Sequence, residues 1–435
     1  MKDLFYIPID EKCIIYMPQR DLAFYADKEV IPIVDKIRNG EALSIEDQKS
    51  VIFQQIDKIR DKYPRVKELI DKPKFDETNF LPTKAIIIPT ETCNLGCTYC
   101  YASAMPIKDK ISWELIENTI EFITKNAISK KRKVIGITFY GGGEPTLQWN
   151  YIEQAVDLLN LKCKNHKLEY DCTIITNGTL LTENKIDWII KNNINIQISF
   201  DVLPDVQLVQ RPFANEKNSH SKVVETINLF QEKKYKINLR CTITENNLLS
   251  MSKTVNYIFN NFKSIKTIHL EPSTSIGRSL STSTYEPNDT VFIREFIKAF
   301  ELGQELGIYV YCSMSDNVGK IKSRFCNTEF TVSSNGAITA CHRYSREETP
   351  NSKLFMYGKF NTETKKFDVD LEKLNNIDSF NGKNYANCKD CYAQYNCAGD
   401  CLSTRVSQDE VLQDGQRCNI VRELLKYDLL RELNS

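Results

Sequence analysis

Short apolar runs alternate with longer stretches of helical period between residues 84 and 310. The apolar runs have the composition of β-strands and occur at 85–89, 134–139, 170–175, 194–200, 237–242 and 267–271. The stretches between them are amphipathic and lie near 113–129, 151–161, 183–192, 222–233 and 251–262. Strands and helices in regular alternation predict a parallel sheet, here of six strands. Six units rather than eight predict an α/β fold, an open and partial (β/α)6 TIM-like barrel.

The N-terminal residues predict a small α+β unit of their own. Two β-type runs, at 4–9 and 13–17, precede helical patterns at 30–37 and 45–59. The following stretch, 71–84, contains two prolines and many polar residues, which is typical of a linker. Together with a cysteine-rich C-terminal part, this pattern predicts three domains, at 1–75, 84–310 and 311–435.

Charge and cysteine content narrow the class of protein. The 57 Lys and Arg residues balance the 57 Asp and Glu residues, so there is no electrostatic case for a nucleic acid or an anionic membrane as partner. No window approaches the length of a membrane span, and the first residues lack the apolar stretch of a signal peptide. Fifteen cysteines without an export signal predict a cytoplasmic protein whose reduced thiols bind metal.

The strongest chemical signal is a C-x3-C-x2-C motif formed by Cys93, Cys97 and Cys100, directly after the first barrel strand. Three thiolates in one loop hold three corners of a [4Fe–4S] cluster and leave the fourth iron open. The spacing argues against structural zinc, which usually takes C-x2-4-C pairs and four closed ligands. About forty residues later, the strand at 134–139 ends in Tyr-Gly-Gly-Gly-Glu-Pro. Both motifs follow strand ends, where the sites of such sheets lie.

At this point the chain resembles the radical S-adenosylmethionine (SAM) superfamily. The three cysteines match its cluster motif, with Tyr99 as the aromatic residue before the last cysteine. Gly142, Gly143 and Glu144 match the family's glycine-glycine-glutamate motif, which receives the amino group of SAM. The resemblance implies that the open iron chelates the amino and carboxylate groups of SAM. It also implies one-electron cleavage of SAM to a 5′-deoxyadenosyl radical.

Two further strand ends match SAM-binding positions of the family. Asn177 follows one of them, and Ser199-Phe200-Asp201 with Arg211 matches a serine-x-aspartate strand end with a later arginine. The resemblance implies that Ser199 contacts SAM and that Arg211 faces its carboxylate or the substrate. The alternative is that these polar groups cap the next loop and helix. The family's usual glycine after the aspartate is Val202 here. Glu271, at another strand end, either reaches the site or is solvated, as strand-end glutamates more often are.

The C-terminal third contains a second set of cysteines whose order resembles the SPASM extension of radical SAM enzymes. That extension implies two auxiliary clusters, and so three [4Fe–4S] clusters in all, together with SAM. The implied ligands of the distal cluster are Cys388, Cys391, Cys397 and Cys418. Those of the proximal cluster are Cys326, Cys341, Cys401 and, as the fourth, Cys312. Without Cys312 the proximal cluster has an open iron for a substrate thiolate. A zinc ribbon is the structural alternative, which the complete pattern disfavours.

SPASM enzymes mostly modify peptides, so the resemblance implies a SAM-cleaving oxidoreductase that matures a ribosomally synthesised precursor peptide. The expected product is an intramolecular crosslink, with cysteine sulfur joined to carbon in a thioether. Carbon–carbon crosslinking and formylglycine formation, as in anaerobic sulfatase maturases, are the alternatives. A flavodoxin- or ferredoxin-type protein is expected to donate the electrons.

Two regions are open to more than one interpretation. His342 stands where sulfatase maturases carry a catalytic aspartate, directly after Cys341. It is a candidate base, or it hydrogen-bonds the cluster region without taking part in catalysis. The unit at 1–75 either caps the barrel or, by a weak topological resemblance, recognises the leader of the precursor peptide.

Overall fold

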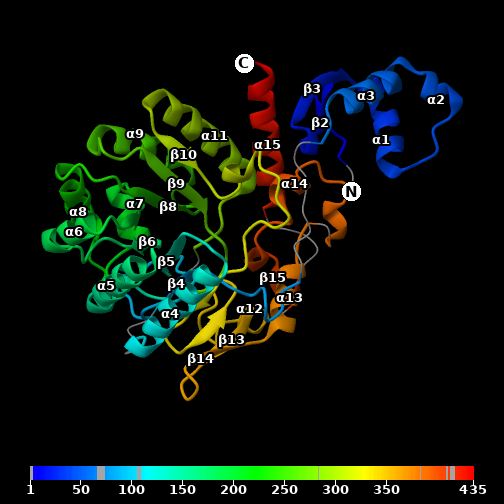
Figure 1. Cartoon of the computed structure of the whole chain (residues 1–435). Helices are drawn as coiled ribbons and strands as arrows, with labels where there is room; N and C mark the ends of the chain where they lie inside the picture. Colours follow the sequence, from blue (N-terminus) through cyan, green and yellow to red (C-terminus); the bar gives the residue numbers. More distant parts are fainter. Residues whose placement is uncertain are drawn as a thin grey trace.

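The computed structural model describes residues 3–65, 74–104, 109–282, 284–382, 384–407, 410–411 and 417–435. Its centre is a sheet of strand order β10-β9-β8-β7-β6-β5-β4-β11-β12-β13-β14. The strands from β4 to β10 run parallel to one another (Figure 1). Their bounds are β4 Lys84–Ile87, β5 Val134–Phe139, β6 Glu169–Thr176, β7 Asn195–Ser199, β8 Asn238–Ile243, β9 Thr267–Pro272 and β10 Tyr309–Tyr311.

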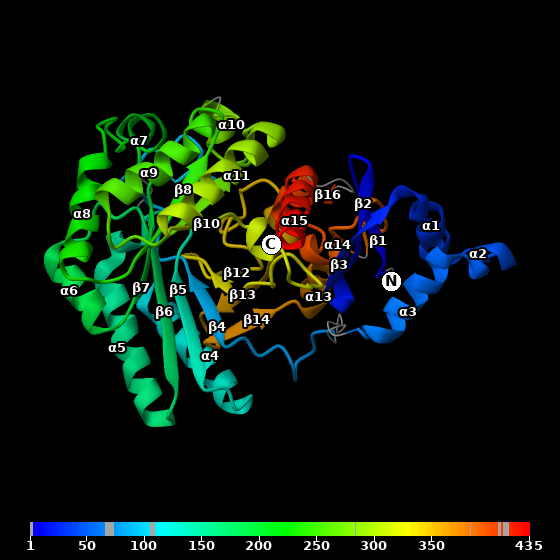
Figure 2. The ribbon, with the colours of Figure 1, turned by 90° about the horizontal axis from the view of Figure 1, so that it is seen from above.

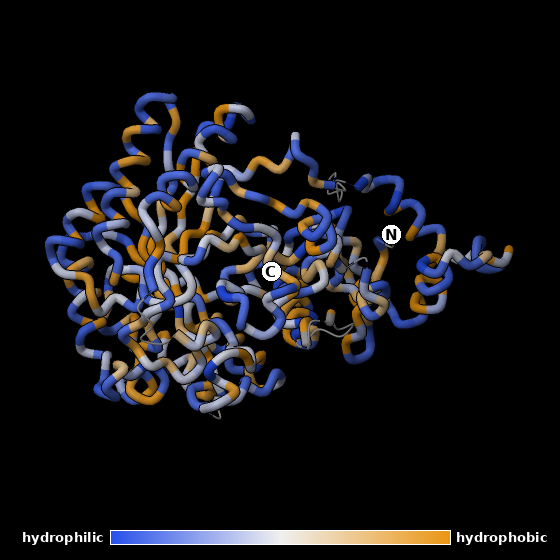
Figure 3. Tube along the Cα trace, turned by 90° about the horizontal axis from the view of Figure 1, so that it is seen from below, coloured by the Kyte–Doolittle hydropathy of each residue, from blue (hydrophilic) through white to orange (hydrophobic). Residues whose placement is uncertain are grey.

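Helices cover the outer face of this parallel sheet, as Figure 2 shows. They are α4 Trp113–Ser129, α5 Trp149–His166, α6 Glu183–Lys191, α7 Pro204–Gln210, α8 His220–Glu232, α9 Met251–Asn261 and α11 Asp289–Leu306. Apolar and polar positions alternate along these helices (Figure 3), so each buries one face against the sheet. The predicted α/β partial barrel is confirmed.

The sheet is longer than the six strands expected from the sequence. Strand β10 extends it beside β9, and β11, Thr331–Val332, pairs in parallel with β4 at the other edge. Antiparallel strands β12 Ala337–Thr339, β13 Met356–Asn361 and β14 Lys366–Val369 follow. The cysteine-rich region therefore continues the barrel sheet and lies beside the strand ends that hold the first cysteine motif.

The N-terminal unit is a three-stranded antiparallel sheet with helices on one face. Its strands are β1 Phe5–Ile9, β2 Lys12–Met17 and β3 Leu22–Asp27, in the order β1-β2-β3. Its helices are α1 Ile31–Asn39, α2 Ile45–Lys49 and α3 Val51–Lys62. The expected helix at 45–59 is divided at Ser50, whose hydroxyl accepts a hydrogen bond from the Phe53 amide and caps α3.

Both faces of this small sheet are buried. One face forms a separate apolar cluster with α1 and α3, in which Ile15 and Ile56 meet. The other face joins the main core, where Tyr16 donates a hydrogen bond of 3.2 Å to Asn396 Oδ1. The unit thus packs against the cysteine-rich region and the C-terminal helix α15, Cys418–Leu433 (Figure 1).

The segment expected to be a linker lies partly outside the described residues, since 71–73 belong to the part that is not described. Phe75 in the described part exchanges two backbone hydrogen bonds with the Asn375 side chain, of 2.7 and 2.8 Å. This end of the connection is therefore fixed to α13, Leu371–Ser379. None of the helices in the described parts of the chain is both long and apolar enough to cross a membrane.

Candidate active site

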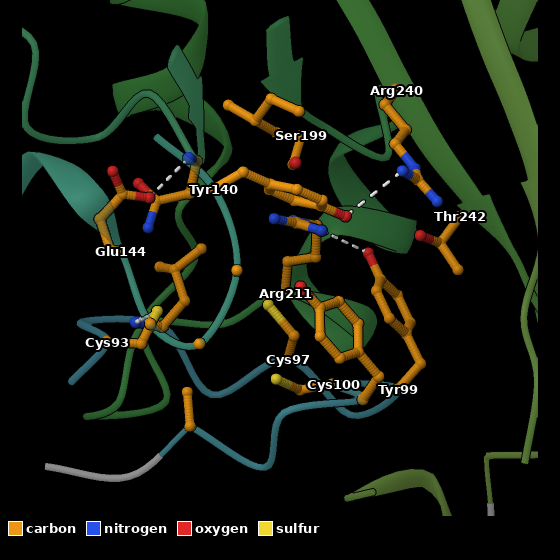
Figure 4. Close-up of a pocket in the computed structure, with 18 of the residues that line it drawn as sticks. Cys93, Cys97, Tyr99, Cys100, Tyr140, Glu144, Ser199, Arg211, Arg240 and Thr242 are labelled. Carbon is orange, nitrogen blue, oxygen red and sulfur yellow. Dashed lines mark hydrogen bonds between the residues drawn. The ribbon is translucent and has the colours of Figure 1, made fainter. Parts of the chain in front are cut away.

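The first cysteine motif lies in the loop after β4 and is held in place by backbone hydrogen bonds. Gly96 N donates to Pro212 O at 2.8 Å, and Thr98 N donates to Gln210 O at 2.9 Å. The side chains of Cys93, Cys97 and Cys100 line one cavity at the carboxyl ends of the strands, and Figure 4 shows their sulfur atoms facing a common space. The backbone therefore arranges the three thiols before any metal binds.

The three sulfur atoms of this motif are not all as close together as the thiolates of a single zinc site would be. A tetrahedral zinc site holds its thiolates about 2.3 Å from the metal, so the sulfur atoms lie within about 4 Å of one another. Among the described residues, no three cysteine sulfur atoms lie within 4.8 Å of one another. Burial raises the pKa of the Cys97 thiol to about 11, so binding of a metal releases its proton.

The glycine-rich loop after β5 touches the backbone of the cysteine loop. Gly143 N donates to Thr90 O at 2.8 Å, and Glu144 N donates to Thr92 O at 2.8 Å. A Cβ atom on Gly143 would lie 1.8 Å from Thr92 O, and Gly142 has a φ of +59°. Both positions require glycine, because a side chain would push the loop away from the cluster motif.

Glu144 and Asn177 connect three loops of the site. The buried Glu144 carboxylate accepts hydrogen bonds from Thr176 Oγ1 at 2.6 Å and from the Asn177 amide at 2.7 Å. The Asn177 side chain donates to Asn94 Oδ1, in the cysteine loop, at 2.8 Å. The predicted residues therefore lie together, and each stabilises the position of the next.

Tyr99, Arg211 and Asp201 form a buried hydrogen-bonded chain beside the cysteines. Arg211 Nη1 donates to the Tyr99 hydroxyl at 2.6 Å, which donates to Asp201 Oδ2 at 2.7 Å. Burial disfavours the charge of Arg211, but Cys97, Tyr99 and Asp201 outweigh it and raise the pKa of the guanidinium. Arg211 Nε is buried and has no hydrogen-bond partner within the described part of the chain. A bound anion such as a carboxylate would satisfy it.

Ser199 also lines the cavity, and the backbone beyond it has an unusual conformation. Val202 has a φ of +67°, in the left-handed region that costs a non-glycine residue about 1–2 kcal/mol. His220 Nε2 lies 3.0 Å from Val202 O and supports this turn. Val202 thus adopts a conformation that favours glycine. The turn that follows Ser199 is therefore present even though valine stands where the family usually has glycine.

Of the two alternatives for Glu271, the buried position in the site is the one observed, and the solvated one is wrong. Its side chain lies inside the site, 3.1 Å from Arg417 Nη1 and 2.8 Å from His269 Nε2. Ser313 donates to it from its amide at 2.9 Å and from its hydroxyl at 2.6 Å. Burial raises the pKa of the Glu271 carboxyl, but His269 and Arg417 outweigh burial and hold it well below its usual range. Arg417 could not be assigned to this site from a local pattern, because it lies 146 residues after Glu271.

Four of the C-terminal cysteines line one cavity of about 320 Å³. They are Cys388, Cys391, Cys397 and Cys418, the four residues grouped by the distal-cluster pattern. Arg405, whose side chain is fully buried, places Nη2 3.8 Å from Cys388 Sγ and 3.9 Å from Cys418 Sγ. A guanidinium at this distance balances the negative charge of thiolates.

Three other cysteines, Cys326, Cys341 and Cys401, affect the pKa values of one another's thiols. The hydrogen bond from Cys326 lowers the pKa of the Cys401 thiol to about 6, and the charges of Arg343 and Arg417 act in the same direction. Burial raises the pKa of Cys341, and Cys401 adds to this effect. These three thiols are therefore near enough to affect one another, and their role as ligands of a proximal cluster stays a prediction.

Cys312 has different surroundings from these three thiols. Its sulfur accepts a hydrogen bond of 3.4 Å from the Ser315 amide. Burial raises its pKa to about 12, and the next strongest influence is the charge of Glu271. Its role as the fourth ligand of a proximal cluster stays a prediction.

His342 does not line the cavity. Its Nδ1 lies 3.1 Å from Glu329 Oε1, and its amide donates to Glu329 Oε2 at 2.7 Å. Its ring lies 4.5 Å from that of Tyr140 and 5.7 Å from that of Tyr101, both of which do line the cavity. The position favours hydrogen bonding over catalysis by His342.

Comparison with known proteins shows likeness to radical SAM proteins. The family model of the radical SAM superfamily matches residues 87–255. The cysteine-type anaerobic sulfatase-maturating enzyme of Clostridium perfringens is 24% identical over 369 residues, which cover 81% of this chain and 98% of that enzyme. The radical SAM cyclopropyl synthase TigE of Paramaledivibacter caminithermalis is 33% identical over 132 residues, 27% of either chain.

Two solved structures share the fold. Native anSMEcpe with bound AdoMet has a TM-score of 0.63 at 21% identity, over 81% of this chain and 99% of that one. Streptococcus suis SuiB bound to precursor peptide SuiA has a TM-score of 0.54 at 14% identity, over 95% of this chain and 98% of that one.

The residues present fit a [4Fe–4S] cluster with SAM. Three thiols face one space, the glycine loop lies against them, and a buried guanidinium nitrogen lacks a partner. When bound, the cluster and SAM supply the radical chemistry, and the protein binds and orients them. The chain therefore contains a radical SAM domain, at residues 87–255.

Proposed function

We propose that this enzyme matures a ribosomally made precursor peptide and joins a cysteine sulfur to a carbon atom of the same peptide. The observation that carries this proposal is the extent of the structural likeness. The likeness to SuiB, solved with its precursor peptide, covers 95% of the chain, whereas that to anSMEcpe covers 81%. The chain has a packed N-terminal unit in addition to a barrel and a cysteine-rich region.

Thioether formation removes a hydrogen atom, a proton and an electron from the peptide, and each of the three needs an acceptor. One electron would enter when SAM is cleaved, and the substrate carbon would give its hydrogen atom to the 5′-deoxyadenosyl radical, which becomes 5′-deoxyadenosine. The substrate thiol loses a proton, the C–S bond forms, and one electron leaves the peptide. Two further clusters are proposed to receive that electron, one held by the four-cysteine cavity and the other by Cys326, Cys341, Cys401 and Cys312. A flavodoxin- or ferredoxin-type donor supplies the first electron.

The N-terminal unit, residues 1–75, is proposed to recognise the leader of that peptide, beside the barrel at 84–310 and the auxiliary region at 311–435. Among the described strands, β3 pairs only with β2, so its other edge is available to an extended peptide. A groove of about 540 Å³ lies between β3 and α3 and is lined by apolar residues, including Phe24, Ile52 and Ile56. Asp27 and Lys58 also line it and offer charged contacts.

Formylglycine formation is the second candidate, and the sequence likeness to sulfatase-maturating enzymes favours it. Two features of this chain favour the peptide crosslink instead. His342 replaces the aspartate that those enzymes carry, and its ring lies behind Tyr101 and Tyr140. The aligned residues cover 98% of the Clostridium perfringens enzyme but 81% of this chain, so this chain has residues beyond those that the two share.

The reaction is tested with the anaerobically reconstituted enzyme, SAM, a reductant and a candidate precursor, chosen as a short cysteine-bearing peptide from the reading frames that neighbour its gene. Tandem mass spectrometry separates the candidates, because a thioether removes two hydrogen atoms and retains sulfur, whereas formylglycine formation removes the sulfur. A crosslinked peptide supports the proposal. Loss of sulfur, or 5′-deoxyadenosine with an unchanged peptide, contradicts it.

Leader recognition is tested separately by introducing a charge into the groove. Phe24→Glu is expected to weaken binding of the same precursor at least tenfold, while the uncoupled cleavage of SAM persists. Leu161→Glu is the matched control, because Leu161 is an exposed apolar residue on the outer helix α5. Equal affinities of the two variants would exclude the groove as the leader site.

A further inference from the structure

We propose that Arg240 and Arg343 form a carboxylate-binding site, and that the substrate peptide presents an aspartate or glutamate side chain to it. The site lies where the SAM cavity meets a second cavity. The proposal rests on the proposed function, because the carboxylate belongs to the peptide. It adds an acidic residue, placed near the modified position, to the chemical description of the substrate.

The second cavity has a volume of about 580 Å³ and opens toward the cysteine-rich region. It shares Tyr101, Thr274 and Arg343 with the SAM cavity. Its walls come from barrel loops on one side and from the segments around Tyr344 and Ser403 on the other. A peptide lying in this cavity reaches the SAM cavity at Arg343.

Arg343, where the two cavities meet, has N–H groups that can still donate hydrogen bonds to a ligand. A guanidinium carries five N–H donors, and Arg343 Nη1 makes long contacts to two hydroxyls, at 3.3 Å to Thr274 and 3.4 Å to Ser403. No carboxylate oxygen lies within 4.0 Å of it in the described ranges of the chain. The thiols of Cys341 and Cys401 balance part of its charge.

Arg240 extends from β8 into the SAM cavity, and Figure 4 shows it beside Tyr140. Its contact with the Tyr140 hydroxyl is 3.4 Å long, and no described carboxylate forms an ion pair with it. Burial and the charge of Arg343 lower the pKa of Arg240, but Tyr140 and Glu271 outweigh them and raise it. The two positively charged guanidinium groups of Arg240 and Arg343 therefore line the same cavity.

The acidic residues of the cavity are already engaged by other groups. Glu144 accepts hydrogen bonds from Thr176 and Asn177, and Glu271 is bound by Arg417, His269 and Ser313. Buried charges are stable only when they are paired. Because no carboxylate of the described residues pairs directly with Arg240 or Arg343, we infer that a ligand supplies one, through the bidentate hydrogen bonds that arginine forms with carboxylates.

SAM carries a carboxylate too, and its position distinguishes the two sources. Arg211, with its unpartnered Nε, lies beside Tyr99 and Cys97, near the cysteine motif. The carboxylate of SAM is expected there, because the open iron chelates it. Arg240 and Arg343 line the cavity with Glu271 and Thr274, toward the second cavity.

The test uses two small probes, N-acetyl-aspartyl-glycinamide and its asparaginyl counterpart, with the unreduced holoenzyme saturated with SAM. Calorimetry is expected to show at least tenfold tighter binding of the aspartyl probe. Arg240→Gln and Arg343→Gln should each abolish this preference. Arg132→Gln, at an exposed position, is the matched control and should retain it. Iron content and SAM binding establish that each variant is folded and loaded.

Three results would overturn the proposal. The first is equal binding of the two probes by the wild-type enzyme, and the second is a preference that persists in both arginine variants. The third is weaker binding of SAM, but not of decarboxylated SAM, in Arg240→Gln, which would assign the site to the cofactor. Failure of the proposed function gives a different pattern, in which the aspartyl preference remains but no peptide is crosslinked.

Discussion

Arg211 donates a hydrogen bond of 2.6 Å to the hydroxyl of Tyr99. That hydroxyl donates in turn to Asp201, so it orients the guanidinium toward the cavity. Tyr99→Phe is expected to weaken SAM binding about tenfold, because a hydrogen bond to a charged group contributes about 1.5–3 kcal/mol. Calorimetry of the cluster-loaded protein measures the effect. Tyr235→Phe, which removes a hydroxyl bonded to the Ile194 carbonyl, should leave SAM binding unchanged.

The unpartnered Nε of Arg211 gives a second prediction. Arg211→Gln removes the charge that is expected to pair with the SAM carboxylate, so SAM binding should fall further than in Tyr99→Phe. Arg211→Lys should recover only part of it, because lysine lacks the planar pair of donors. Wild-type affinity in Arg211→Gln would show that this residue supports the loop without binding the cofactor.

Gly143→Ala should prevent the cysteine loop from loading iron. The new Cβ would lie 1.8 Å from Thr92 O, a contact that the backbone cannot relieve without moving the loop. Gly96→Ala, in the cysteine loop, is the matched control, because its Cβ would be 3.7 Å from its nearest neighbour. Iron analysis after reconstitution should show a loss of about four irons per chain in Gly143→Ala alone. Full iron content in that variant would contradict the close approach of the two loops.

The four-cysteine cavity predicts a separate loss of iron. Cys391→Ala should remove about four irons, the content of one cluster, while cleavage of SAM continues. Cys172→Ala is the control, since Cys172 is a buried thiol within strand β6. Unchanged iron in Cys391→Ala would rule out the distal cluster without affecting the first one.

His220 predicts a pH dependence of stability. Burial holds the pKa of His220 below its ordinary value of about 6.5. Below that pH the unfolded chain takes up a proton that the folded protein resists, so stability rises with pH and is lost as pH falls. The melting temperature should therefore drop between pH 7.5 and 6.0, and less so in His220→Gln. An equal drop in both proteins would mean that His220 does not titrate in this way.

Much of the barrel could be predicted because its signals are local. The strand at 134–139 and the helix at 113–129 have the same bounds in the structure as in the pattern of apolar residues. The cysteine and glycine motifs lie together because both follow parallel strands. The helix α11 was missed, although Asn288 caps its start and Gly307 ends it.

What the sequence could not predict depends on contacts between distant parts of the chain. Strands β10 and β11 have three and two residues, too few for a periodic signal, and they exist because a neighbouring strand offers hydrogen bonds. The burial of Glu271 depends on Arg417. The left-handed conformation of Val202 opposes its local preference and is maintained by its buried surroundings.

The central claim is that SAM binds through its carboxylate and amino groups to an open iron held by Cys93, Cys97 and Cys100. Electron–nuclear double resonance of the reduced enzyme with SAM labelled by ¹⁷O in its carboxylate tests this directly. The claim predicts a strong ¹⁷O coupling to the cluster signal, which disappears in the variant with alanine at all three cysteines. A wild-type spectrum with no such coupling, although SAM is bound, would contradict it.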